Sequence, residues 1–340
     1  MRVTLDEVCT KATSKYAQKD LANMTGEYPV FGASGFIKNI GVYQQEKTYV
    51  AVVKDGAGIG RTMLLPGKSS VIGTMQYLLP KENVLPKFLY YAVKSMHLEK
   101  YYTGATIPHI YFKDYKKETF DLPEDTRQKE IINIFDKVEL IIQSRKLQLK
   151  ALDELSKSRF VEMFGDPVCN SMNLPTMKGI DIFRLTNGKF VPESKRYELG
   201  IPAYGGNGIS WYTDAALIQK DTIVIGRVGF QSGNVHFAKG PLWITDNAMY
   251  INNFNAEKYD LFFMYYLMRY IDFTRFQDAG DLKKITQKPF MNMKYIMPVL
   301  SRQREYVAFV KQTDKSRLLF KCQLLQYHSI EDIIRGRNYG

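Results

Sequence analysis

The 340-residue sequence is poor in the side chains that build disulfide and metal centres. Its three cysteines, Cys9, Cys169 and Cys322, lie far apart and form no CxxC pair. This spacing indicates neither a disulfide framework nor a zinc knuckle. The four histidines show no HExxH or HxH spacing, so we expect no metal site.

Long apolar segments are missing as well. The first residues lack the apolar core of a signal peptide. No apolar run approaches the ~20 residues that a membrane-spanning helix needs. We therefore expect a cytoplasmic protein.

No familiar enzyme motif is complete. Gly67-Lys68-Ser69 has the end of a P-loop, but Thr62 stands where its first glycine belongs. The run from Gly56 to Gly60 lacks the final spacing of a dinucleotide fingerprint, because Arg61 follows it. It is more simply a tight turn at which backbone approaches a ligand or a neighbouring strand. We find no catalytic constellation and expect a non-catalytic protein; an enzyme with an unrecognised site is a further hypothesis.

Positive charge is what the sequence has in excess. Lys and Arg number 47 against 35 Asp and Glu, which gives a net charge of +12. Such an excess favours a polyanion or an acidic membrane surface as partner through long-range attraction. A merely soluble basic protein is the alternative. The length suggests about two domains.

The chain also repeats itself. Leu122-Pro123 followed by Arg127-Gln128-Lys129-Glu130 recurs as Met297-Pro298 followed by Arg302-Gln303-Arg304-Glu305, where 303 − 128 = 175. Upstream, the run from Tyr28 to Gly32 is echoed by the run from Ile201 to Gly205, where 202 − 29 = 173. A period this long indicates a duplicated domain with an attached helix rather than a solenoid unit.

Each copy predicts a small α/β domain of irregular, mostly antiparallel strands. In both copies two strand-like runs are followed by a helix with apolar residues every three to four positions. In the first copy these are residues 49–53, 76–79 and 86–93; in the second they are residues 222–225, 248–251 and 260–267.

After each domain the apolar period changes to that of a coiled coil. No Gly or Pro interrupts residues 124–164, which at 1.5 Å per residue predicts a helix roughly 55–60 Å long. The apolar stripes of the two helices share a spacing of four and three. The predicted seam comprises Ile131, Phe135, Val138, Ile142, Leu149 and Leu152 in the first helix, and Val310, Phe320 and Leu324 in the second.

Two long helices with matching stripes are expected to pack together, and an antiparallel pairing is natural because a whole domain separates them. The alternative is that each helix lies separately on its own domain. The predicted fold class is mixed α/β, with two similar domains joined by an antiparallel coiled coil. The expected division is domain 1 at 1–123, helix at 124–165, domain 2 at 166–300 and helix at 301–336.

This layout resembles the specificity subunit of type I restriction-modification systems. Asp121-Leu122-Pro123 with Arg127–Ile132 is similar to the element that starts each spacer helix of that family. Gly104–Ile110 resembles its glycine-threonine loop, and Lys54–Arg61 resembles its strand-to-loop glycine element.

The resemblance implies two target recognition domains on a helical spacer. It implies double-stranded DNA, two methyltransferase subunits and a restriction motor-nuclease subunit as partners. S-adenosylmethionine and ATP are then expected on the partner subunits, with no cofactor on this chain. A two-domain nucleic-acid-binding scaffold without a methyltransferase is the alternative function.

Reading DNA needs cations for phosphates and planar donor–acceptor groups for base edges. Such residues gather near the glycine turns, although solvated loops are rich in them too. The candidates are Lys38, Asn39, Gln44, Lys54, Arg61 and Gln76 in the first copy, and Asn207, Trp211, Arg227, Gln231, Asn234, His236 and Lys239 in the second. Lys283 and Lys284 are expected to contact phosphate. Because the loops differ between copies, we expect an asymmetric, two-part target.

Overall fold

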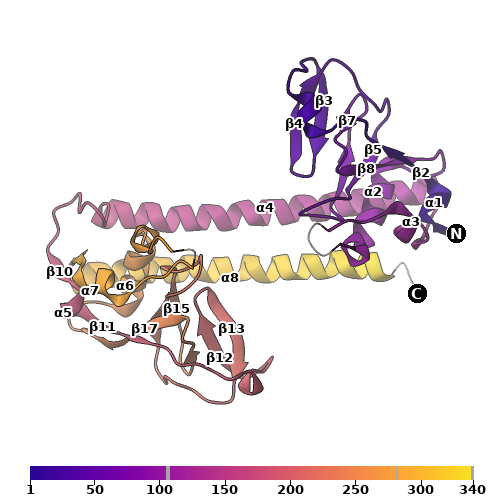
Figure 1. Cartoon of the computed structure of the whole chain (residues 1–340). Helices are drawn as coiled ribbons and strands as arrows, with labels where there is room; N and C mark the ends of the chain where they lie inside the picture. The colour runs from indigo at the N-terminus through magenta and orange to yellow at the C-terminus, as the bar shows by residue number, and fades with distance from the viewer. Residues whose placement is uncertain (105–107, 281, 338–340) are drawn as a thin grey trace. The chain divides into compact units, whose positions relative to one another are not determined.

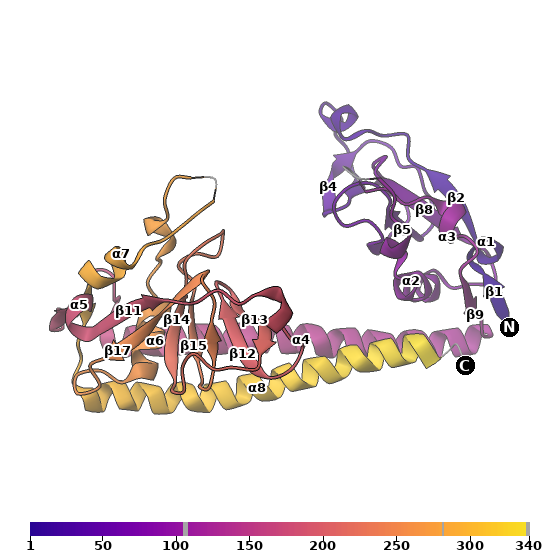
Figure 2. The same cartoon turned by 60° about the horizontal axis from the view of Figure 1, so that its bottom comes forward.

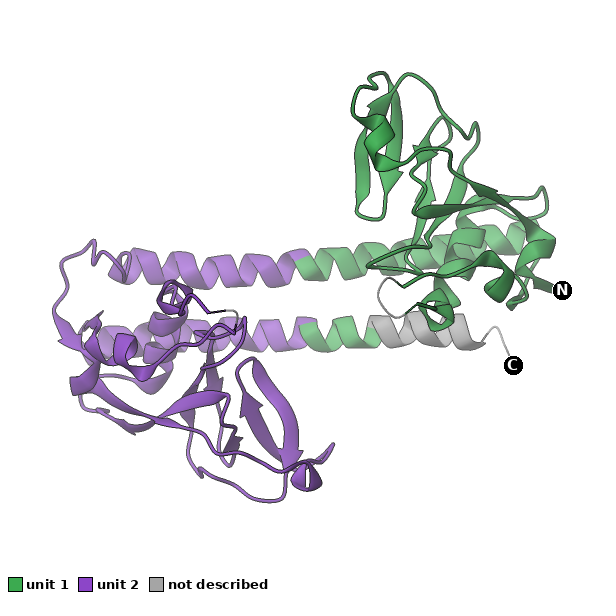
Figure 3. Cartoon of the chain, in the orientation of Figure 1, with its two compact units in different colours: residues 1–146, 321–340 green, residues 147–320 purple. Residues whose placement is uncertain are grey.

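The computed structural model describes residues 1–104, 108–280 and 282–337, with side chains described as far as residue 326. The chain divides into two compact units, residues 1–146 with 321–340 and residues 147–320 (Figure 3). Part of the glycine-threonine loop, residues 105–107, lies outside the described residues, as does Asp281 in the second copy. Within the described ranges, no helix combines the length and apolarity needed to cross a membrane.

The first unit is built on an antiparallel four-stranded sheet in the order β2-β8-β5-β6. These strands are β2 (Cys9–Thr13), β5 (Tyr49–Val53), β6 (Thr62–Leu65) and β8 (Met75–Pro80). Every residue of β5 is buried, as its uninterrupted apolar run predicts. Helix α2 (Pro86–Ser95) packs on this sheet (Figure 1), with Phe88 and Leu89 in one core with Val50 and Val52.

Smaller elements complete the first unit. A three-stranded sheet has the order β4-β3-β7, and β1 pairs with β9. The bounds are β1 (Arg2–Thr4), β3 (Tyr28–Gly32), β4 (Gly35–Ile40), β7 (Ser70–Val71), β9 (Thr119–Asp121), α1 (Leu5–Val8), η1 (Gln18–Leu21), η2 (Leu98–Tyr101) and α3 (Phe112–Tyr115).

The second unit repeats this plan. Its sheets have the orders β11-β17-β14-β15 and β13-β12-β16, and β10 pairs with β18. The strands are β10 (Thr176–Lys178), β11 (Phe183–Asn187), β12 (Ile201–Gly205), β13 (Gly208–Thr213), β14 (Thr222–Gly226), β15 (Val235–Ala238), β16 (Trp243–Ile244), β17 (Ala248–Phe254) and β18 (Lys294–Ile296). The shorter helices are α5 (Gly179–Ile182), η3 (Glu193–Lys195), α6 (Leu261–Arg269), η4 (Thr274–Phe276) and α7 (Gln287–Asn292).

Helix α6 begins one residue later than the predicted helix at 260–267 because Asp260 caps it. The Asp260 carboxylate accepts hydrogen bonds from the backbone N–H groups of Phe262 at 2.8 Å and Phe263 at 3.0 Å. Among the described strands, only the pairs β3-β7 and β12-β16 are parallel. The predicted mixed α/β class with mostly antiparallel strands is thus confirmed in both units.

Two long helices follow the domains, α4 (Asp125–Phe164) and α8 (Leu300–Arg337). Each differs by one residue at either end from the predicted 124–165 and 301–336. Helix α4 is continuous from the first unit into the second. Its end at Phe164 coincides with Gly165, whose φ of +73° a side chain rarely adopts.

The predicted apolar stripe on α4 packs against different elements along its length. In the first unit Phe135, Val138 and Ile142 are buried. The ring of Phe135 stacks on Tyr91 of α2 with centroids 4.6 Å apart, and Ile131 packs against the same core. The apolar spacing predicts that these two side chains belong to a helix–helix seam. The correction is that α2 of their own unit also covers them, because the helix begins directly beside its domain.

In the second unit the described parts of α4 and α8 contact one another and run antiparallel. The Ser156 and Thr313 hydroxyls lie 3.3 Å apart, and the Tyr306 hydroxyl donates to the Ser156 carbonyl oxygen at 3.0 Å. Towards the other end, Arg317 pairs with Asp153 at 2.9 Å. Residues with higher numbers on α4 contact residues with lower numbers on α8, so the two helices run antiparallel.

Helix α6 joins this helix pair to the second sheet (Figure 2). The ring of Phe263 in α6 stacks on Phe160 of α4 at 5.8 Å and meets Tyr306 of α8 edge-on at 6.3 Å. All three side chains are buried in one cluster. Aromatic contacts of this kind add specific geometry to hydrophobic burial, so the sheet is held firmly on the helices.

Candidate nucleic-acid interface

A turn rich in glycine follows the central strand of the first unit. Residues 54–61, here called glycine loop 1, include three glycines with φ of +83°, +89° and +79°, a region that favours glycine. The loop closes on itself, because Gly60 N–H donates to the Val53 carbonyl at 2.9 Å and Val53 N–H donates to the Arg61 carbonyl at 2.9 Å. These hydrogen bonds fix the course of the loop backbone.

Two other segments of the first unit meet glycine loop 1 through backbone hydrogen bonds. Gly56 N–H donates to the Pro108 carbonyl at 2.9 Å, and Ile110 N–H donates to the Lys54 carbonyl at 2.9 Å. Lys54 N–H donates to the carbonyl of Thr74, in the turn before β8, at 3.0 Å. Residues 108–110, the end of the segment predicted as a glycine-threonine loop, are called crossing segment 1 below.

We call the hydrogen-bonded glycine loop and crossing segment of a unit its frame. The second unit repeats the frame of the first unit bond for bond. Gly229 N–H donates to the Lys283 carbonyl at 2.8 Å and Ile285 N–H to the Arg227 carbonyl at 2.9 Å. Arg227 N–H donates to the Asn247 carbonyl at 2.9 Å. Glycine loop 2 is thus residues 227–234 (54 + 173 = 227), and crossing segment 2 is residues 283–285 (108 + 175 = 283). In Figure 2 the two segments lie side by side beyond the ends of β14 and β15.

The neighbouring hairpin turns approach the same place. In the first unit the Arg61 guanidinium donates to the Ala33 carbonyl, in the turn between β3 and β4, at 2.8 Å. In the second unit the Asn234 amide donates to the Asn207 side chain, in the turn between β12 and β13, at 3.5 Å. Each unit therefore brings three segments, distant in sequence, to one surface.

The two frames differ in charge. In the first unit Asp55 pairs with Lys54 at 3.2 Å and with His109 at 2.8 Å. The corresponding positions of the second unit are Val228 and Lys284. The second surface consequently lacks that carboxylate and carries Arg227 and two lysines of crossing segment 2. A surface of this kind suits phosphate contacts.

The structure places two of the predicted DNA contacts away from the frames: Asn39 pairs with Pro29 at the end of the β3-β4 hairpin opposite its turn, and Lys239 follows β15 at the end opposite glycine loop 2. The other predicted contacts form three groups. One group is exposed at or near these frames: Arg61, Asn207, Gln231 and Lys284. A second group is half-buried there: Lys54, Arg227, Asn234 and Lys283. A third group is held inside its own unit by packing or hydrogen bonds: Lys38, Gln44, Gln76, Trp211 and His236.

Gln76, predicted from the sequence as a DNA contact, is instead buried. Its side chain is only 3% exposed and donates to the Ala12 carbonyl of β2. The Lys38 ammonium donates to the Leu21 carbonyl at 2.9 Å, and the Gln44 side chain accepts from the Tyr77 hydroxyl at 3.3 Å. The polar ends of these side chains form hydrogen bonds within the first unit. A single sequence does not distinguish such side chains from those that read bases.

Trp211 and His236 are also partly withdrawn from solvent. The Arg196 guanidinium lies over the Trp211 ring, 4.3 Å from its centroid. Burial lowers the pKa of the His236 imidazole, which favours the neutral form. Within the described part of the chain, neither Trp211 Nε1 nor His236 Nε2 has a hydrogen-bond partner.

Sequence reasoning missed two residues of the second surface, Phe230 and Asn247. Phe230, in glycine loop 2, is 87% exposed. Asn247 carries the carbonyl that fixes Arg227. Aligning the glycine loops by position would have drawn attention to Phe230, because its counterpart in loop 1 is the small Ala57 (57 + 173 = 230).

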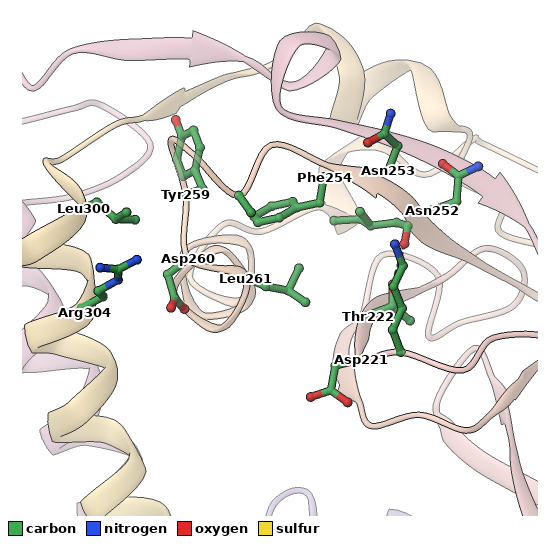
Figure 4. Close-up of a pocket in the computed structure, with 13 residues that line it drawn as sticks. Asp221, Thr222, Asn252, Asn253, Phe254, Tyr259, Asp260, Leu261, Leu300 and Arg304 are labelled. Atoms are coloured by element: carbon green, nitrogen blue, oxygen red, sulfur yellow. Dashed lines mark hydrogen bonds between the residues drawn. The ribbon is translucent and has the colours of Figure 1, made fainter.

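A cavity of about 410 Å³ lies at the opposite end of β14, away from glycine loop 2 (Figure 4). Asp221 and Thr222 line one side, and Leu300 and Arg304 of α8 line the other. The cavity is therefore separate from the candidate interface. In the part of the chain that the structure describes, no three His, Cys, Asp or Glu side chains are placed to hold a metal ion.

Comparison with known proteins agrees with this duplicated architecture. A family model described as the type I restriction modification DNA specificity domain matches residues 1–152 and again 176–326. A protein of Mycoplasma genitalium named as a type I specificity subunit is 27% identical over 318 residues, covering 86% of this chain and 79% of its own length.

Solved structures share the fold. The crystal structure of a type I restriction-modification S subunit from M. genitalium has a TM-score of 0.66 at 19% identity, covering 100% of this chain and 96% of that one. A chain from a study of complex assembly and conformational transition of the type I system has a TM-score of 0.55 at 15% identity, covering 99% and 97%.

Proposed function

We propose, since the chain belongs to the family of type I restriction-modification DNA specificity subunits, that its two units read the two halves of an asymmetric DNA target. The chain is a non-catalytic component of a restriction-modification complex, and its role is DNA sequence specificity. The proposal adds how the recognition is divided within the chain.

One observation carries the proposal. The two units hold their glycine loops and crossing segments with the same backbone hydrogen bonds, yet present different side chains on them. A fixed frame with variable side chains is what two reading surfaces for different base sequences need, because direct readout depends on side-chain donors and acceptors. Residues 1–123 and 166–300 would then be the two target recognition domains.

The proposed contacts follow from position at the two surfaces. Arg61, Arg227, Gln231, Asn207 and Asn234 would meet base edges, and Lys54, Lys283 and Lys284 would meet phosphates. Arginine and the amide side chains can form paired hydrogen bonds with purine edges, whereas lysine acts as a point charge.

The long helices would serve as spacer and as docking surface. Leu140, Leu147 and Leu155 of α4 are exposed, and their spacing of seven and eight residues places them along one side of the helix. We infer that two methyltransferase subunits cover such positions and that a motor-nuclease subunit joins them in the cytoplasm. S-adenosylmethionine, for adenine methylation, and ATP would be bound by those partners.

Methylation sequencing tests the proposal. Cells that carry the chain with its methyltransferase should show a two-part adenine-methylated motif, and this motif should vanish when the chain is deleted. Restoring the gene is the control and should restore the motif. DNA binding with no change in methylation would instead favour the two-domain scaffold without a methyltransferase.

A further inference from the structure

We propose that Phe230 contacts the DNA bases directly, most favourably a thymine methyl group, and gives glycine loop 2 an apolar base contact that glycine loop 1 lacks. This inference rests on the proposed function, because it concerns the half-site that the second unit would read.

Exposure is the first observation. A single exposed apolar side chain is ordinary on a protein surface. Phe230 is 87% exposed, however, although it lies between polar and charged groups in the middle of glycine loop 2. Other phenylalanines of the same unit, among them Phe263 and Phe290, are fully buried, so the core of this unit accepts such side chains.

The second observation is that the loop holds the ring outward. Gly229 has φ of +89°, and its N–H donates to the Lys283 carbonyl at 2.8 Å. The Gln277 amide donates to the carbonyls of Phe230 at 3.4 Å and Ser232 at 2.8 Å. With the backbone fixed on both sides, little backbone freedom is lost when the ring meets a ligand.

The third observation is that polar and positively charged residues lie near Phe230. Arg227 and Gln231 lie on the same loop, and crossing segment 2 adds Lys283 and Lys284. Cations attract the phosphate backbone, while arginine and amide groups match the donor and acceptor pattern of the major groove. In that groove the apolar feature of the bases is the thymine 5-methyl group, which suits a phenyl ring.

Loop 1 provides an internal comparison. Its backbone follows the same course, with Gly56 bonded to Pro108 as Gly229 is to Lys283, but Ala57 replaces Phe230. A methyl side chain cannot reach as far as a phenyl ring. An apolar base contact from this loop position is therefore expected in one half of the target alone.

The test uses the chain assembled with its methyltransferase partners and duplex DNA bearing the motif found by methylation sequencing. Phe230→Ala should weaken binding to that duplex about five- to tenfold and leave binding to unrelated duplex unchanged. Replacing one thymine of the second half-site by deoxyuridine should weaken wild type by a similar factor. That replacement should cause no further loss in the variant.

Val168→Ala is the matched control, because Val168 is an exposed apolar residue in the turn after α4. Thermal unfolding and complex assembly should be unchanged for both variants. An unaltered motif and affinity for Phe230→Ala would overturn the inference, as would loss of assembly without DNA or insensitivity to every deoxyuridine replacement. If wild type itself methylates no two-part motif, the proposed function fails, and this outcome is seen before any variant is compared.

Discussion

Gln128 and Gln303 make the same three hydrogen bonds at equivalent places in the two units. The Gln128 amide donates to the carbonyls of Pro123 at 3.0 Å and Asn83 at 3.1 Å, and its oxygen accepts from Leu85 N–H at 2.9 Å. The Gln303 side chain does the same with Pro298 at 2.7 Å, Lys258 at 2.9 Å and Asp260 N–H at 2.9 Å. Both side chains are buried. The glutamine of the repeated Arg-Gln motif thus links each long helix to the domain before it through hydrogen bonds.

Removing the three hydrogen bonds of Gln303 should destabilise the protein. Gln303→Ala leaves two carbonyls and one N–H without their partner in a buried place, so we expect the free energy of unfolding to fall by about 2–4 kcal/mol. Urea denaturation followed by circular dichroism measures the change. Gln312→Ala is the control, because Gln312 is exposed on the same helix. Equal midpoints for the two variants would show that the three bonds contribute nothing to stability.

Crossing segment 2 should contribute phosphate contacts. Replacing Lys283 and Lys284 together by glutamine should weaken binding to all DNA sequences alike. The slope of log binding constant against log salt concentration should become shallower by about 2, because two counterion-releasing contacts are lost. Binding titrations at several salt concentrations provide the measurement.

Lys220→Gln with Lys258→Gln is the matched control for charge. These exposed lysines lie just before β14 and α6, at the end of the unit away from glycine loop 2. The control should lower the net charge equally and change the slope less. The same slope in both double variants would mean that charge in general, rather than crossing segment 2, drives binding.

Helix length should set the number of unread base pairs within the target. Adding seven residues that keep the apolar spacing to both α4 and α8 lengthens each by about 10 Å. At about 3.4 Å per base pair, the gap in the methylated motif should grow by about three base pairs. Methylation sequencing reads the gap directly. A gap of unchanged length would refute the role of the helices as a spacer, whereas insertion into one helix alone should abolish methylation by breaking the pairing.

The three thiols should differ in reactivity. Cys9 is buried, and burial raises the pKa of its thiol to about 12, whereas Cys169 and Cys322 are exposed. At pH 8 only about one Cys9 thiol in 10⁴ would be ionised, and thiolate is the reactive form. A thiol-specific disulfide reagent should therefore modify two cysteines promptly and the third only after unfolding. Prompt reaction of all three would show that Cys9 is accessible in the folded protein.

Much of the local structure was predictable because it depends on neighbouring residues. The apolar run at Tyr49–Val53 predicts the buried strand β5, and Pro86 predicts the start of α2. The absence of Gly and Pro after position 123 predicts α4 to within one residue at each end. Repetition of one motif predicts that the second half of the chain folds like the first.

The site was less predictable because its parts come together only in the folded chain. Sequence reasoning found the glycine loops, but Asp55 meets His109 across 54 positions of the sequence. It also counted Gln76 among the DNA contacts, although the strand that carries this residue turns its amide inward. Polar side chains look alike in a sequence whether they meet solvent, DNA or a buried carbonyl.

The sequence by itself therefore determined a duplicated, basic, mixed α/β chain with two long helices, since periodicity, charge and repetition are properties of residues in order. Only the tertiary structure decided which polar groups face outward, that Phe135 packs on α2, and that three distant segments form each candidate surface. The physical reason is that burial and hydrogen bonding satisfy groups through whichever partners the fold brings near, regardless of their separation along the chain.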